Sequence, residues 1–237
     1  MTSNFKLFIS ATSESIQNIK TAKGKKVDIT ADKDWVKTDV YQEGRLKRVK
    51  IPKRDTGFTF DDLLLAISTT ESELGLPDNL LLSVIRIESV GDPRSISGQG
   101  AVGFAQMRED FRKHWKVKDP HYVPDVVPKM GAALKHFYNL AQNSPNKDNY
   151  KGFGWDNSWE LAAMMYNRGA QGVLDWLGRG APMTGQGALK VETLDYANSM
   201  AHLMKGGIES EIPTMRSKWE QTMPLSGQSM ISDEDME

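Results

Sequence analysis

Hydrophobic and polar positions follow two different patterns along the chain, and the change falls near residue 57. In the first part, apolar residues alternate with charged or polar ones at a period of two, as in Val27–Ile29 and Leu46–Ile51. Alternation of this kind predicts short β-strands. We therefore expect residues 1–57 to form a small β-containing module or an extended basic arm.

From Phe58 onward the apolar residues recur at the three- and four-residue spacing of amphipathic helices. Thr59 or Asp61 can cap the first helix, Gly75 can end it, and Pro77 suits the first turn of the next. The expected helices cover residues 59–75, 77–89, 104–115, 126–142, 158–168, 171–178 and 191–205. Residues 58–207 are thus expected to form a mainly α domain, and residues 208–237 an acidic tail that is mobile or ordered by a partner.

The composition fits a globular protein with one sizeable domain and smaller attachments, or at most two domains. The 237 residues are 39% hydrophobic and 26% charged, which is too apolar for general disorder. There is no cysteine, and none of the four histidines stands four residues from another, so neither a disulfide framework nor a zinc centre is expected. We expect chemistry without a metal ion or a cofactor.

Charge changes sign where the hydrophobic pattern changes. Residues 1–57 hold 13 Lys and Arg against 7 Asp and Glu, whereas the remainder holds 17 against 24. This difference supports a boundary near residue 57, although a solvated basic face without a partner explains the surplus equally well. A nucleic-acid partner is not expected, because the positive surplus is confined to the first part and lacks regular aromatic interleaving.

The N-terminal sequence MTSNFKLFISATSES carries one lysine and a broken apolar patch, which is a poor match to a signal peptide. No stretch approaches the roughly 18 consecutive apolar residues of a membrane-spanning helix. The sequence therefore predicts a protein that is made in a cytoplasm without the usual export signal and without a membrane span.

The helix that ends near Ser89 places one carboxylate among apolar side chains. On a helical wheel Glu88 falls near the centre of an apolar arc. The arc is formed by Leu80, Leu81, Leu82, Val84, Ile85 and Ile87. Poor hydration raises the pKa of a carboxyl, and an acid that keeps its proton near neutral pH can protonate a glycosidic oxygen. A buried structural glutamate, paired with an arginine or a helix N-terminus, is the alternative interpretation.

A loop rich in glycine and serine follows this helix over residues 91–103. Gly98, Gly100 and Gly103 allow positive φ angles and close backbone approach, so the loop can fold tightly beside Glu88. Ser97 and Gln106 add polar groups that can hydrogen-bond a carboxyl or an acetamido group. Taken alone, the segment is equally compatible with a plain connection between two helices.

Two adjacent segments resemble the soluble lytic transglycosylase family. Glu88-Ser89 is similar to its E-S pair, and residues 97–106, SGQGAVGFAQ, are similar to its S-x-x-G-A-x-G-L-M-Q motif. Phe104-Ala105 stands where the family has Leu-Met, an apolar change that leaves the polar positions intact.

Further motifs follow in the family's order. Residues 161–169, LAAMMYNRG, resemble A-x-Y-N-x-G, and residues 192–196, ETLDY, resemble E-T-x-x-Y. Between them, Gly131–Leu134 is similar to the intervening helix, whereas Val127-Pro128 replaces the usual Asn-Ile pair. The resemblance spans about residues 76–205, and the order of the motifs makes it specific.

The resemblance implies a lysozyme-like helical fold of the goose type. It also implies an enzyme that cleaves the β-1,4 bond between N-acetylmuramic acid and N-acetylglucosamine of peptidoglycan and leaves a 1,6-anhydro product. Glu88 would be the catalytic acid and then the base, and Ser97 and Gln106 would orient the substrate's acetamido group or Glu88. Tyr166 would donate a hydrogen bond in the cleft near Glu88, and Asn167 would brace the loop behind it.

Other interpretations of the motifs stay open. Tyr196 is expected to pack the last helix onto the core and not to contact sugar. Because ordinary glycosidases use two carboxylates, a hydrolytic muramidase in which Asp92 or another acid activates water is the alternative activity. The other acids near Glu88 in the sequence are Glu109 and Asp110. A structural virion or secretion subunit with an inactive lysozyme-like fold is a further alternative.

The resemblance and the poor match to a signal peptide together favour a bacteriophage setting. A phage can carry such an enzyme in its particle or tail and use it for cell-wall penetration during infection. The enzyme would then act in the periplasm or cell wall, and residues 1–57 and 208–237 would attach it to other virion or tail proteins. A conjugation-type secretion system is the alternative setting.

Overall fold

The computed structural model describes residues 35–42, 45–52 and 58–222. Within these ranges it holds eight α-helices and one pair of strands, so the prediction of a mainly α region after residue 57 is confirmed. The helices are α2 Phe60–Leu74, α3 Leu80–Ser89, α4 Glu109–Trp115, α5 Val123–Gln142, α6 Asn157–Arg168, α7 Ala170–Gly178, α8 Val191–His202 and α9 Ile212–Thr222. A π-helical turn at Leu203–Gly207 continues α8.

The two strands form an antiparallel pair. β1 covers Trp35–Gln42 and β2 covers Arg45–Pro52. The strand expected at Leu46–Ile51 lies within β2, whereas the strand expected at Val27–Ile29 falls outside the described residues. The domain boundary near residue 57 stays a prediction.

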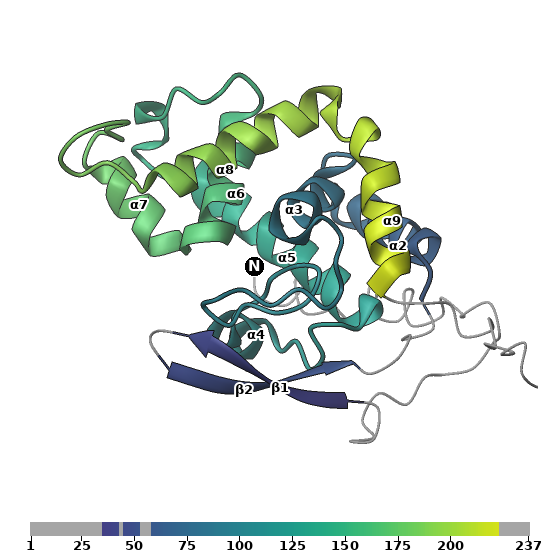
Figure 1. The fold of residues 1–237 in the computed structure, drawn as a ribbon. Helices are drawn as coiled ribbons and strands as arrows, with labels where there is room; N and C mark the ends of the chain where they lie inside the picture. Colours follow the sequence, from purple (N-terminus) through teal and green to yellow (C-terminus); the bar gives the residue numbers. More distant parts are fainter. Residues whose placement is uncertain (1–34, 43–44, 53–57, 223–237) are drawn as a thin grey trace, which may run out of the picture.

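Figure 1 shows α3 and α5 in the middle of the helical domain, with α6, α7 and α8 on one side and α2 and α9 on the other. The core between the helices is made of large apolar side chains that are almost entirely buried: Phe60, Leu63, Leu81, Ile85, Leu134 and Trp176. At Gly131 of α5 the packing on α2 is so close that a Cβ atom would lie 2.7 Å from Cγ2 of Thr70. Because α3 packs against α2, α5 and α8, its position is fixed from several sides.

The first two helices of this domain start and stop at residues with clear backbone signals. Thr59 caps α2 through a reciprocal capping box, and Gly75 closes that helix with a left-handed φ of 57°. The next helix, α3, begins at Leu80 and not at Pro77 as expected. The reason is that Asn79 takes a left-handed φ of 67°, which a right-handed helix cannot contain.

Two other helix starts also differ from the sequence-based expectation. The helix expected from Phe104 begins only at Glu109, because Gln106 takes a left-handed φ of 45°. Phe104 is instead buried as part of the preceding loop. In contrast, α5 begins earlier than expected, at Val123, since Pro124 suits the first turn of a helix.

Residues 208–237 were expected to be mobile or ordered by a partner, but residues 208–222 pack on the helical domain of the chain itself. Glu209–Glu211 form a 3-10 turn, Ile212–Thr222 form α9, and Trp219 of α9 is buried. The indole N–H of Trp219 donates to the carbonyl of Phe58 at 3.2 Å, and its ring centroid lies 5.7 Å from that of Phe104. Aromatic burial of this kind fixes α9 onto the helical domain and supports the loop that precedes α4. Residues 223–237 lie outside the described part of the chain.

Candidate active site

Glu88 lies in the last turn of α3, and its neighbour Ser89 connects this helix to the following loop. The Ser89 hydroxyl donates to the carbonyl of Phe104 at 2.7 Å and accepts the N–H of Gly91 at 3.1 Å. Val90 then takes a left-handed φ of 58° and ends the helix. The end of α3 and the loop are therefore positioned together.

The loop of residues 91–107 is held in shape by its own polar side chains. The Ser97 hydroxyl accepts the backbone N–H of Ala101 at 3.0 Å. The Gln106 side chain donates from Nε2 to the carbonyl of Gly103 at 2.9 Å. Both residues predicted to orient the substrate therefore also stabilise the loop on which they lie.

Glycine is required at two points of this loop. Gly100 and Gly103 take left-handed φ angles of 77° and 78°. A Cβ atom at Gly103 would also lie only 2.0 Å from the carbonyl oxygen of Pro120, so any larger residue would displace the loop. Gly98, expected to share this role, is not among the glycines with a positive φ in the described part of the chain.

A cleft with a volume of about 530 Å³ lies between the end of α3, this loop and the end of α6. Its lining includes all five residues that the sequence singled out: Glu88, Ser97, Gln106, Tyr166 and Asn167. The fold thus brings together residues from three separate segments around one space. Their contact with a sugar stays a prediction.

The partly buried Glu88 carboxyl sits where its protonated form is favoured. Burial raises the pKa of Glu88 from 4.5 to about 7, a hydrogen bond from Tyr196 opposes the rise, and the negative charge of Glu192 adds to it. Oε1 accepts the Tyr196 hydroxyl at 2.9 Å, while Oε2 accepts no hydrogen bond from any residue that the structure describes. A carboxyl that keeps its proton near neutral pH and has an unbonded oxygen at a cleft can protonate a bound molecule.

Tyr196 contacts Glu88 directly. The sequence-based expectation, that Tyr196 only packs the last helix onto the core, missed this contact. The Tyr196 ring is buried in the core, but its hydroxyl donates to a carboxylate 108 residues earlier in the chain. Burial and the negative charge of Glu88 hold the pKa of Tyr196 well above 10, so the phenol stays a donor. The ETLDY motif contains the signal for this contact. Glu192 and Tyr196 stand four residues apart on one face of α8, and Glu192 lines the cleft.

Tyr166 and Asn167 lie at the end of α6 on the cleft wall. The Tyr166 hydroxyl donates to the carbonyl of Ala105 at 2.9 Å, so it bonds to the loop and not to the Glu88 carboxyl. Burial, and then the charge of Glu88, raise the pKa of Tyr166 well above 10. The Asn167 side chain accepts a hydrogen bond from the Thr193 hydroxyl at 3.1 Å. This bond connects α6 to α8, whereas Asn167 was expected to brace the loop behind Tyr166.

Asp92, considered as the second acid of a hydrolytic enzyme, does not line the cleft. One of its carboxylate oxygens lies 3.4 Å from Nζ of Lys218 on α9, so it helps to hold α9 in place. The acids that line the cleft together with Glu88 are Asp110 and Glu192. Of the acids near Glu88 that the sequence offered for a second carboxylate, Asp110 lines the cleft and Asp92 does not.

The part of the chain that the structure describes contains no group of three or more His, Asp or Glu side chains that could hold a metal ion. Within the same residues, no helix is long and apolar enough to cross a membrane. The polar groups that do line the cleft are carboxyl, hydroxyl, amide and guanidinium groups.

Comparison with known protein families matches residues 63–182 to the Transglycosylase SLT domain. Searches of curated proteins and of solved structures found no match to the chain. The matched range covers just over half of the 237 residues and contains Glu88, the loop 91–107 and the Tyr166-Asn167 pair. The chain therefore belongs to the transglycosylase SLT family, with the lysozyme-like helical fold of that family, and is a lytic transglycosylase that acts on peptidoglycan.

Proposed function

We propose that Glu88 is the catalytic acid and that it acts on the β-1,4 bond between N-acetylmuramic acid and N-acetylglucosamine. The observation that carries this proposal is the state of Glu88, whose raised pKa and unbonded Oε2 are found on the wall of the cleft. In the first step the carboxyl gives its proton to the glycosidic oxygen, and the bond between that oxygen and C1 of the muramic acid breaks.

In the second step the Glu88 carboxylate takes the proton of the C6 hydroxyl of the same sugar, and O6 bonds to C1. This closes a 1,6-anhydro ring, consumes no water and restores the protonated carboxyl. Between the two steps the sugar's own acetamido oxygen can bond to C1 as an internal nucleophile. Gln106 suits the orientation of that group, because its Oε1 accepts no hydrogen bond from a described residue and can accept an acetamido N–H.

We assign the other cleft residues to substrate binding. Ser97 lies on the same loop as Gln106, and Tyr166 and Asn167 line the cleft from the end of α6. Since the polar atoms of these side chains already hold the loop and α8, their positions are fixed before a sugar binds. Prepositioned polar groups of this kind lose little conformational entropy on binding.

Hydrolysis is the second candidate reaction, because Asp110 and Glu192 also line the cleft. A second carboxylate can activate water, and the product then ends in a reducing muramic acid and not in an anhydro sugar. In that case the enzyme would be a muramidase with Glu88 still as its acid.

Digestion of purified sacculi followed by mass spectrometry of the products separates these reactions. The proposal expects muramic ends that are lighter by one water than the hydrolytic ends. Glu192→Gln should leave this anhydro product in place, whereas a hydrolase that depends on Glu192 would lose its turnover. Reducing ends alone, from the wild-type chain, would overturn the proposed reaction.

We also propose that the enzyme is a component of a bacteriophage particle or tail that opens the cell wall during infection. The support is the basic surplus of residues 1–57, opposite in sign to the rest of the chain, which suits attachment to an acidic partner. Mass spectrometry of purified particles tests this proposal, since the chain should be present in them at a fixed copy number. Its absence from particles, with the chain present in the infected cell, would contradict it.

A further inference from the structure

A second pocket lies on the face of α4 that points away from the cleft. It has a volume of about 370 Å³ and is lined by residues from the helix and from the segment that follows it: Glu109, Arg112, Lys113, Lys116, Val117 and Lys118. The cleft takes Asp110 and Phe111 from the same helix. At about 3.6 residues per turn, these two residues and the pocket residues face opposite sides, so the thickness of α4 separates the two spaces.

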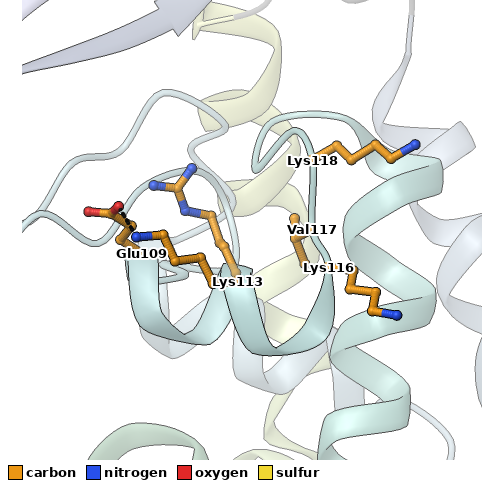
Figure 2. Close-up of a pocket in the computed structure, with 6 residues that line it drawn as sticks. Glu109, Lys113, Lys116, Val117 and Lys118 are labelled. Carbon is orange, nitrogen blue, oxygen red and sulfur yellow. Dashed lines mark ion pairs between the residues drawn. The ribbon is translucent and has the colours of Figure 1, made fainter.

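Cationic side chains dominate this α4 pocket. Figure 2 shows Lys113 paired with Glu109 on one side of Val117, and Lys116 and Lys118 extending on the other. The Nζ of Lys113 lies 2.7 Å from Oε1 of Glu109. Neither Lys116 nor Lys118 forms an ion pair with a side chain in the described ranges. Two of the lysines around the pocket are therefore available to an external anion.

Arg112 adds a guanidinium group to the lining of the pocket. Its Nε is buried and has no hydrogen-bond partner among the described residues. Burial raises the pKa of the neighbouring Asp119 to about 6, and the positive charge of Arg112 opposes that rise. The Arg112 guanidinium thus brings a further positive charge to the lining of the pocket.

The helix alone does not explain the charge cluster. The C-terminal end of a helix attracts cations, and this accounts for Arg112 and Lys113 in the last turn of α4. Lys116 is the C-cap residue of α4, and its backbone N–H donates to the carbonyls of Arg112 and Lys113. Lys118 lies beyond the helix end, which therefore does not account for it. The place of both lysines around the same pocket indicates a site for an oxyanion, for which guanidinium and ammonium groups are the usual donors in proteins.

Building on the function proposed above, we propose that the α4 pocket binds carboxylate groups of the peptide stems carried by the glycan strand in the cleft. An extended peptide spans about 3.3 to 3.6 Å per residue, so a stem of about four or five residues reaches past the roughly 10 to 12 Å diameter of a helix. A stem attached to a sugar in the cleft also brings its carboxylates to the pocket at a high effective concentration.

The test compares two forms of one substrate on the full chain. One form is purified glycan with its peptide stems, and the other is the same glycan after an amidase has removed them. The pair Lys116→Gln and Lys118→Gln, made together, should raise KM for the stem-bearing glycan roughly threefold to tenfold and leave kcat unchanged. With stripped glycan, this double variant should match the wild type.

The matched control is Lys147→Gln with Lys151→Gln, which removes the same charge from residues that line neither space. The control pair should leave KM unchanged for both glycans. An equal rise in KM for the control pair, or a rise for stripped glycan as well, would overturn the proposal, because the lysines would then act through general charge or through the glycan.

A binding experiment decides the matter independently of turnover. A synthetic stem peptide with free carboxylates should shift the backbone NMR signals of residues 116–118, and its fully amidated form should not. Shifts with inorganic phosphate but none with the peptide would reassign the pocket to a phosphate polymer. If the wild type cuts neither glycan, the proposed function fails. The peptide titration still tests the α4 pocket on its own, because it measures binding of the stem carboxylates and not turnover.

Discussion

A glutamate with a raised pKa lies at each end of α3, Glu71 from α2 at the N-terminal end and Glu88 at the C-terminal end, yet only Glu88 lines the cleft. At the N-terminal end, Glu71 of α2 accepts the backbone N–H groups of Asn79 and Leu81 at 2.9 and 2.7 Å. At the C-terminal end, Glu88 accepts one hydrogen bond, from Tyr196. Burial raises the pKa of both carboxyls to about 7.

The difference between the two carboxyls lies in what their oxygen atoms already bond. Both oxygens of Glu71 accept N–H groups in the first turn of α3 and just before it, and the side chain is buried with an exposed fraction of 3%. Glu88 has one oxygen without a bond from the described residues and lies on the cleft wall. A raised pKa therefore does not separate a structural carboxyl from a candidate acid, whereas unbonded oxygen atoms at a cleft do.

The largest expected effect is the loss of turnover in Glu88→Gln. The amide keeps the shape of the side chain but cannot give up a proton, so turnover on sacculi should fall by at least roughly 10²- to 10⁴-fold. Circular dichroism and the unfolding midpoint should show an intact fold. Near-wild-type turnover in this variant would remove Glu88 from the mechanism and with it the contrast between the two ends of α3.

For Glu71→Ala we expect the opposite result, a loss of stability with little loss of activity. Two backbone N–H groups at the start of α3 would lose their acceptor, and the free energy of unfolding should fall by about 2 to 4 kcal/mol. Activity per folded molecule should stay within about a factor of a few, because Glu71 does not line the cleft. Ser72→Ala, at the exposed neighbouring position, is the control and should change neither quantity.

The local motifs of the sequence are enough to predict that Glu88, Ser97 and Gln106 lie around one cleft, because these residues belong to one continuous helix and loop. Their roles toward a substrate stay predictions. The motifs are not enough to predict the bond between Tyr196 and Glu88, which tertiary packing creates between α8 and α3. The helix α9 was missed for a related reason. Only Met215 and Trp219 of α9 are buried, so its apolar stripe is too short to stand out in the sequence.

A smaller effect should appear in the pH dependence of stability. For Glu71, Glu88 and Asp119 the pKa in the folded state, about 7, 7 and 6, lies above the ordinary values of 4.5, 4.5 and 3.8. The folded state therefore binds more protons than the unfolded state between those values. Stability that is fully present below about pH 4 should be lost as the pH rises through about 7.

Glu88→Gln removes one of these contributions and should flatten the curve. At about pH 8 the variant should be more stable than the wild type by on the order of 1 kcal/mol, and at about pH 4 the two should agree. Glu209→Gln, at an exposed position outside the cleft, should follow the wild-type curve. Parallel curves for Glu88→Gln and wild type in urea unfolding would contradict the raised pKa of Glu88.

The smallest expected effect concerns the pH profile of kcat/KM, which Tyr196→Phe and Glu192→Gln should shift in opposite directions. If protonated Glu88 is the acid, kcat/KM should fall as the pH rises through about 7. The Tyr196 hydroxyl lowers the pKa of Glu88 and the charge of Glu192 raises it. Tyr196→Phe should therefore move this fall to higher pH, and Glu192→Gln should move it to lower pH, each by less than about one unit.

The double variant makes this test specific to Glu88. With both neighbours changed, the two shifts oppose each other, and the fall should return toward its wild-type position. A merely structural role for Tyr196 would lower stability or kcat without moving the profile. Shifts of equal sign in the single variants would mean that the titrating group is not Glu88, because these two neighbours act on its carboxyl in opposite directions.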